Sequence, residues 1–251
     1  MLAELGRVVS YATLGVMAAG AIVSRPREGG RVVRAQIARQ IVFSAWDGIP
    51  LVALIAGMMT VSIVVIVATL APAASTPELV GGLLATVIVR ELAPLMTAVI
   101  VALRSCAAVT VELGYMSWRG EVEALETMAI DPAKFLLLPR FAGLTIASVS
   151  LTIVFTATVF GAAAAGVRLL EVDSSVEHMA TVLHTLVSAT AMSVAVIKAT
   201  AFGLIIAAVS CYHGLSVRSD VTHLPRRATR ALVEVLVLCT SVNVAITLIA
   251  L

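Results

Sequence analysis

Long apolar stretches dominate the chain and alternate with short segments that carry most of the charge. A helix needs about 20 residues to cross the hydrocarbon core of a bilayer. Five stretches approach or exceed this length: residues 49–70, 79–113, 135–167, 179–212 and 231–251. Their apolar runs are continuous, whereas the strands of a membrane barrel alternate apolar and polar positions. The pattern therefore predicts an all-α polytopic membrane protein with five spans.

The N-terminal region differs from the rest. Residues 8–24 are apolar but short, and most of the nearby arginines follow them, which opposes export of what comes next. This favours a helix lying in the membrane interface. From Arg31 onward the apolar residues recur near helical spacing, which predicts an amphipathic surface helix leading into the first span. These apolar residues are Val32, Val33, Ile37, Ile41 and Val42. We therefore divide the chain into an N-terminal cytoplasmic or interfacial region, 1–47, and a five-span domain, 48–251.

Composition supports a membrane protein and excludes several other classes. Hydrophobic residues make up 60% of the 251 residues, charged residues only 13%, and mean hydropathy is +1.06. Soluble domains are about half apolar and about a quarter charged. These figures argue against a soluble enzyme, a disordered tail or a nucleic-acid-binding module. The three cysteines lie far apart in apolar surroundings, which indicates small buried side chains rather than a metal or disulfide framework.

The loop charges predict the orientation in the membrane. Six arginines precede residue 47, three basic residues follow the second span, and four follow the fourth span. The other two loops hold only Arg168 between them. Because cytoplasmic loops carry an excess of Lys and Arg, we expect a cytoplasmic N-terminus and, after five spans, a C-terminus on the outer side.

Several motifs that would indicate catalysis are missing from the sequence. There is no G-x-x-x-x-G-K-[ST] phosphate-binding loop, no H-E-x-x-H and no G-x-S-x-G. The four histidines share no metal-ligand spacing, and no nucleophile–base pair is visible. We therefore expect neither a metal site nor a cofactor, and an intramembrane enzyme is the weakest hypothesis.

Charged residues inside the spans are the first candidates for function, because their burial in a membrane is costly. Arg90 and Glu91 lie near the middle of the second span, followed by Pro94, which removes a helical hydrogen bond and can kink the helix. Neighbouring residues point about 100° apart on a helix. Glu91 is thus expected to face a cavity while Arg90 pairs elsewhere, and the alternative is an ion pair that holds helices together.

The other charges in the spans favour structural roles. Arg104 and Glu112 lie eight residues apart on one helix face, and packing or pairing is the preferred interpretation. Lys198 lies in mid-span and needs a carboxylate or carbonyl partner. For Glu234, near the start of the fifth span, we favour a simple interfacial position. Ala199 and Gly203 are small residues four apart, which allow close helix packing.

A short acidic helix is predicted in the loop after the second span, over residues 120–132. Val122, Leu125, Met128 and Ala129 form an apolar stripe along it, and Pro132 is expected to end it. The spacing alone fits equally a helix resting on the bundle and a helix that docks a soluble partner.

Together these motifs resemble the MlaE/YrbE family of permease subunits, which belong to ABC-type lipid transporters that work with MCE-domain proteins. The sequence RELAP at 90–94 resembles the family's R-E-L-G-P, and the stretch from Arg104 to Met116 resembles its A-E-L-G-x-M region. Residues 121–140 are similar to its A-L-E-x-M…D-P…P-R segment. IKATAF at 197–202 and RATR at 227–230 are similar to I-K-x-x-x-F and R-A-T-T-R. Ala93, Leu103 and Val122 depart from the family pattern.

The resemblance implies a homodimer with an N-terminal elbow helix and five spans per subunit, in a bacterial inner membrane. It also implies a separate ATPase, a periplasmic MCE-domain partner and a lipid substrate, of which phospholipid is the class we expect. Glu91, with Arg90 beside it, carries over as the candidate for the lipid path, and the pocket is expected between spans one, two and five. The acidic helix becomes a coupling helix that docks the ATPase. Its candidate residues are Glu121, Val122, Leu125, Glu126, Met128 and Asp131. The alternative hypothesis is a non-transporting scaffold that anchors an ATPase or an MCE complex.

Overall fold

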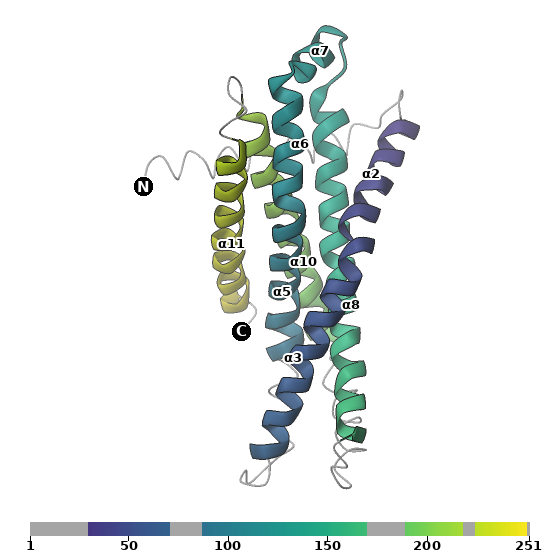
Figure 1. The fold of residues 1–251 in the computed structure, drawn as a ribbon, viewed down its shortest axis with the longest axis vertical. Helices are drawn as coiled ribbons and strands as arrows, with labels where there is room; N and C mark the ends of the chain where they lie inside the picture. Colours follow the sequence, from purple (N-terminus) through teal and green to yellow (C-terminus); the bar gives the residue numbers. More distant parts are fainter. Residues whose placement is uncertain (1–29, 71–86, 170–188, 218–223, 250–251) are drawn as a thin grey trace.

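The computed structural model describes residues 30–70, 87–169, 189–217 and 224–249, and its regular elements there are all helical (Figure 1). Three of the elements are π-helical turns (η3, η4 and η5) and one is a 3-10 turn (η1). In chain order they are α2 (Gly30–Ser44), η1 (Trp46–Gly48), α3 (Ile49–Leu70), η3 (Ile88–Leu92), α5 (Ala93–Val101), η4 (Ala102–Cys106), α6 (Ala107–Trp118), α7 (Glu121–Thr127), η5 (Ala133–Leu137), α8 (Leu138–Leu169), α10 (Ala189–Leu215) and α11 (Leu224–Ile249).

Five helical stretches in the described residues are long and apolar enough to cross a membrane, which confirms the predicted number of spans. They are Ala35–Ile66, Ile88–Trp118, Ala133–Gly166, Thr190–Leu215 and Leu224–Ile249. The expected starts of the second and fourth spans, at 79 and 179, lie outside the described residues. The fifth helix begins at Leu224 rather than at 231, because its arginines occupy its first two turns instead of a loop.

The N-terminal helix runs almost directly into the first span. The expected interfacial segment, 8–24, lies outside the described residues. The amphipathic stripe from Arg31 onward is helical, as predicted, in α2. One 3-10 turn, η1, separates α2 from α3, and α2 lies against α8 along the side of the bundle (Figure 1). Its position relative to a membrane surface stays a prediction.

The disturbance expected at Pro94 takes the form of a π turn rather than a sharp break. Pro94 lies in the first turn of α5 and has no backbone N–H to donate. Immediately before it, η3 makes i→i+5 bonds, and the N–H of Ala93 donates to the carbonyl of Ile88. The second span therefore stays continuous while Arg90 and Glu91 occupy a widened turn, a feature often found at functional sites.

Small side chains allow close packing around α10. Ala199 is completely buried, and a Cβ added at Gly203 would lie 2.6 Å from the Cα of Thr145 in α8. This agrees with the close approach expected from the small residues. The three cysteines are unpaired and buried, as the sequence indicated.

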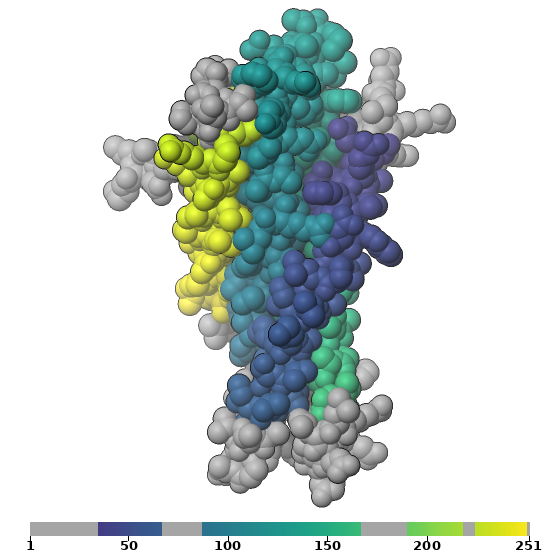
Figure 2. Space-filling model, in the orientation of Figure 1, coloured from purple at the N-terminus to yellow at the C-terminus, as the bar shows by residue number. Residues whose placement is uncertain are grey.

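The start of α2, the short helix α7 and the start of α11 lie at the same end of the bundle (Figure 1). We call this the basic end, because it carries the segments that hold most of the loop arginines and lysines. Figure 2 shows α11 as a band along one flank, beside the helix formed by α5 and α6. Of the five spans, those containing α3 and α11 bury the smallest share of their residues.

Candidate functional site

A cluster of four polar side chains joins three helical elements inside the membrane-spanning part. Glu91 comes from η3, Lys198 from α10, and Asn243 and Thr247 from α11. Lys198 Nζ lies 2.6 Å from Glu91 Oε2 and donates to Thr247 Oγ1 at 2.7 Å. Asn243 Nδ2 donates to Glu91 Oε2 at 3.2 Å, and Thr247 Oγ1 lies 2.9 Å from the same oxygen. One carboxylate oxygen thus gathers three neighbours.

Lys198 is the most deeply buried member of the cluster, with none of its side chain exposed. A cation in such a place requires an anionic partner, because removal from water is costly. The expectation that Lys198 needs a carboxylate or carbonyl is confirmed, and the carboxylate is that of Glu91. The Thr247 hydroxyl also lies 2.8 Å from the carbonyl of Asn243 in its own helix. Since it carries one proton, it donates either to that carbonyl or to Glu91.

Glu91 directs its Oε2 into this cluster and keeps 24% of its side chain exposed. Arg90 Nε lies 3.9 Å from the other oxygen, Oε1, so both carboxylate oxygens face a cation. This geometry also has the form of the alternative interpretation, an ion pair that holds helices together. It connects the second span to the fourth and fifth spans.

Arg104 and Glu112 each have a partner on another element, in line with the pairing interpretation. Arg104 lies 3.0 Å from Asp47 Oδ2, also donates to the Asp47 carbonyl, and stacks over the Phe43 ring at 5.8 Å. Glu112 Oε1 accepts a hydrogen bond of 2.7 Å from Arg140, whose side chain is only 3% exposed. The second span is therefore tied to the N-terminal helix at one point and to the third span at another.

The predicted coupling helix exists as α7, but it is shorter than expected. It ends at Thr127, whereas the stripe and Pro132 had suggested helix to residue 130. Ala129 adopts a left-handed conformation with φ of 59°. Its N–H donates to the Glu126 carbonyl, and the N–H of Ile130 donates to the Leu125 carbonyl. This is the Schellman arrangement that closes a helix, with alanine at the position that usually holds glycine.

The early end of α7 divides the apolar stripe into two parts. Val122 and Leu125 pack against the hydrophobic core. Met128 is 61% exposed and lies beyond the helix, at the tip of the basic end (Figure 1). Both interpretations therefore apply to different residues: the first part rests on the bundle, and the second part faces outward.

The acidic residues of the segment also differ in their surroundings. Glu121 lies 3.6 Å from Arg119 in an exposed ion pair, and Glu126 is exposed. Asp131 accepts a hydrogen bond of 2.9 Å from the N–H of Ala133 and so caps the start of η5. Glu121 and Glu126 remain available to a partner, whereas Asp131 has a local structural role.

A second polar group at the basic end was missed by the sequence interpretation. Glu234, expected to be simply interfacial, lies with Oε2 2.9 Å from Nε2 of His213 in α10. Arg227 donates to the hydroxyl of Ser216 nearby. The available signal was the short connection between the fourth and fifth spans, which makes the last turns of one helix neighbours of the first turns of the next.

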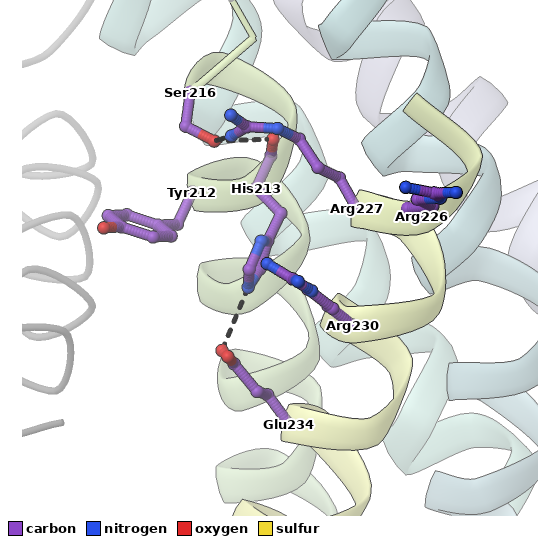
Figure 3. A pocket seen from close by; sticks show the side chains of 7 residues that line it. All are labelled: Tyr212, His213, Ser216, Arg226, Arg227, Arg230 and Glu234. Atoms are coloured by element: carbon purple, nitrogen blue, oxygen red, sulfur yellow. Dashed lines mark hydrogen bonds and ion pairs between the residues drawn. The ribbon is translucent and has the colours of Figure 1, made fainter. Parts of the chain in front are cut away.

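These side chains border a cavity of about 470 Å³ between α10 and α11 (Figure 3). Its described lining consists of Tyr212, His213, Ser216, Arg226, Arg227, Arg230 and Glu234. Among the residues that the structure describes, no group of three His, Cys, Asp or Glu side chains could hold a metal ion.

Comparison with known proteins identifies the family. Residues 37–249 match the family described as Permease MlaE. A probable ABC transporter permease protein of Rickettsia prowazekii is 32% identical over 169 residues, which cover 65% of this chain and 64% of that protein. The intermembrane phospholipid transport system permease protein MlaE of Haemophilus influenzae is 38% identical over 95 residues, 38% of this chain and 36% of its own length.

A plant relative extends this comparison. The chloroplastic protein TRIGALACTOSYLDIACYLGLYCEROL 1 of Arabidopsis thaliana is 30% identical over 158 residues, 63% of this chain and 45% of its own length. The chain spans a little under two thirds of the length of the Rickettsia relative. The family match covers all five candidate spans except the first two residues of the first one. The chain is therefore a multi-pass membrane protein that belongs to the MlaE permease family, a class of ABC transporter subunits without catalytic activity of their own.

Proposed function

We propose that this protein is the permease subunit of an ABC-type transporter that moves phospholipid between an inner membrane and a periplasmic MCE-domain protein. A separate ATPase subunit supplies the energy. The family match supports this proposal, as does the name of the Haemophilus relative, an intermembrane phospholipid transport permease. The observation that carries the mechanism is the Glu91–Lys198 cluster, because it ties together three spans at a point where a membrane protein has no other use for charge.

In this proposal the ATPase docks on the tip of the basic end. Met128 and Ile130 offer exposed apolar surface there, and Glu121 and Glu126 offer negative charge. Val122 and Leu125 transmit the movement, because they connect α7 to the hydrophobic core. The basic end is then cytoplasmic, which gives a cytoplasmic N-terminus and a periplasmic C-terminus.

The working unit is a homodimer, with the lipid pocket between two copies. The exposed apolar face of α3 is consistent with such an interface; Leu51, Leu54, Met58 and Val61 are each more than 40% exposed. Glu91 lies on the lipid path. A displacement of α11 would separate Asn243 and Thr247 from Glu91, leaving its carboxylate and the nearby Arg90 able to contact a headgroup.

The test must separate a role in transport from a role in holding helices together. In the variant Glu91→Leu/Lys198→Met both charges are replaced by apolar groups of similar size, a change that buried ion pairs often tolerate. We expect this variant to fold, to bind the ATPase and to lose phospholipid transfer to the MCE partner in proteoliposomes. Ser62→Ala is the control, because this exposed hydroxyl bonds only to its own helix, at Met58. Full transfer by the double variant would refute the lipid-path role of Glu91.

A second variant separates transport from scaffolding. Met128→Asp places a charge on the exposed tip without disturbing the core, and we expect it to reduce ATPase binding. Leu125→Asp should do the same, although it also disturbs packing. If docking variants abolish function in cells while the Glu91 variants preserve it, the protein is a scaffold and the transport proposal is wrong.

A further inference from the structure

The cavity at the basic end combines features that the proposed transport path does not use. Three of its seven described lining residues are arginines, all from the first two turns of α11. Arg227 and Arg230 point from α11 toward α10, and Arg226 lies to the other side of the helix (Figure 3). A second cavity, of about 620 Å³, adjoins the same row and shares Arg226, Arg230 and Glu234 with the first one.

The positive charge of this row is only partly compensated within the described residues. Glu234 is the one acidic residue in the described lining, and its Oε2 is held by His213. Arg227 donates to the uncharged hydroxyl of Ser216. In the part of the chain that the structure describes, Arg226 and Arg230 have no carboxylate within 4.0 Å. The start of α11 adds the partial positive charge of a helix N-terminus. The site therefore favours an anion.

The same face of α11 becomes apolar directly below the arginines. Arg226 and Arg230 are four residues apart and share one face of the helix. At 100° per residue, the exposed residues Val233, Val237, Val244 and Leu248 continue along that face, and they are between 53% and 68% exposed. Val233 also lines the second cavity, next to Arg230. A positive group at a helix end above a long apolar strip matches a phospholipid, with its phosphate at the arginines and its acyl chains along the strip.

We propose that the α10–α11 cavity and the adjoining face of α11 form a binding site for an anionic phospholipid in the leaflet at the basic end. Basic pockets between membrane helices on the cytoplasmic side are known to bind acidic headgroups. Arg226 and Arg230 contact the phosphate, and Arg227 is positioned by Ser216 at the back of the cavity. The site does not include Glu91 and does not depend on whether the protein transports lipid.

The test uses the full-length protein in detergent, with equal amounts of phosphatidylglycerol and phosphatidylcholine added, and native mass spectrometry to count retained lipids. We expect the wild-type protein to retain phosphatidylglycerol preferentially. Each basic side chain near a membrane changes the affinity for acidic lipid roughly fivefold, so Arg226→Gln/Arg230→Gln should lower it roughly thirtyfold. Arg39→Gln/Arg119→Gln removes the same charge from exposed positions elsewhere and should leave retention unchanged.

Further arms keep the test decisive. Arg226→Lys/Arg230→Lys preserves the charge and should keep the preference for phosphatidylglycerol, which controls for misfolding of the glutamine variant. Inorganic phosphate alone should bind too weakly to displace the lipid, because the acyl strip contributes to binding. The proposal is overturned if the wild type shows no preference, or if phosphate displaces the lipid completely. It is also overturned if the glutamine variant loses dimers or ATPase binding while its lipid retention is unchanged.

Discussion

Removal of the buried cation in the second-to-fourth-span ion pair should destabilise the protein strongly. Lys198→Met keeps the length of the side chain but deletes the ammonium group, which makes two hydrogen bonds of 2.6 and 2.7 Å. Glu91 would keep Asn243 and Thr247 as neighbours, with Arg90 at 3.9 Å. Breaking a buried pair by removing one partner costs about 3–5 kcal/mol. Because Glu91 retains these neighbours and is 24% exposed, we expect the low end, about 3 kcal/mol.

The opposite substitution should cost more. Glu91→Gln leaves the Lys198 ammonium with no exposed surface and no full negative charge beside it. We therefore expect about 4–5 kcal/mol for this variant. In the double variant Lys198→Met/Glu91→Gln neither charge remains, so the loss should be at least about 2 kcal/mol smaller than the sum of the single losses.

Reversible unfolding in mixed micelles, followed by circular dichroism, measures these free energies. Oligomeric state and detergent are held constant, because association changes apparent stability. Thr240→Val is a suitable control, since its hydroxyl is exposed and bonds only to Leu236 of its own helix. A cost below about 1 kcal/mol for Lys198→Met, or single losses that simply add, would refute the view that the pair carries a large coupling energy.

Three further predictions concern other parts of the bundle. Gly203→Ala places a Cβ 2.6 Å from the α8 backbone and should cost about 1–3 kcal/mol in thermal unfolding, whereas Gly161→Ala, with no atom within 4 Å, should cost nothing. Ala129→Gly relieves the left-handed conformation at the end of α7 and should slow amide exchange there, by up to about 1 kcal/mol of local stability; faster exchange would contradict the assignment of the turn. Glu112→Gln should destabilise more than Arg140→Met, because the arginine left behind is 3% exposed whereas the glutamate is 54% exposed. The reverse order in chemical unfolding would mean that Arg140 is not the partner that depends on the pair.

The sequence was sufficient for the spans and for the type of contact that each buried charge makes. Continuous apolar length identifies a membrane helix directly, which explains why the number of spans is correct. The cost of burying a cation predicted that Lys198 has a partner. It could not identify Glu91, because 107 positions separate the two residues and only the packing of the helices brings them together.

Local backbone details were harder to predict. Pro94 indicated a disturbance but not the π turn at 88–92, since a π turn leaves no periodic signature over five residues. The end of α7 depends on Ala129 in a conformation that alanine adopts rarely, so Pro132 was the more obvious signal. The arginines at 226–230 were used only for topology, because their role depends on a cavity formed with α10.

The attachment of α11 has a mechanical consequence. Its completely buried residues end at Cys239, and the remaining turns are held to their neighbours largely through Asn243 and Thr247. At the opposite end, the bond from Glu234 to His213 fastens it to α10. A rigid rod fixed by polar contacts near both tips has two possible pivots. Release of one fastening allows that tip to swing outward about the other, so which contact breaks first determines which side of the membrane opens.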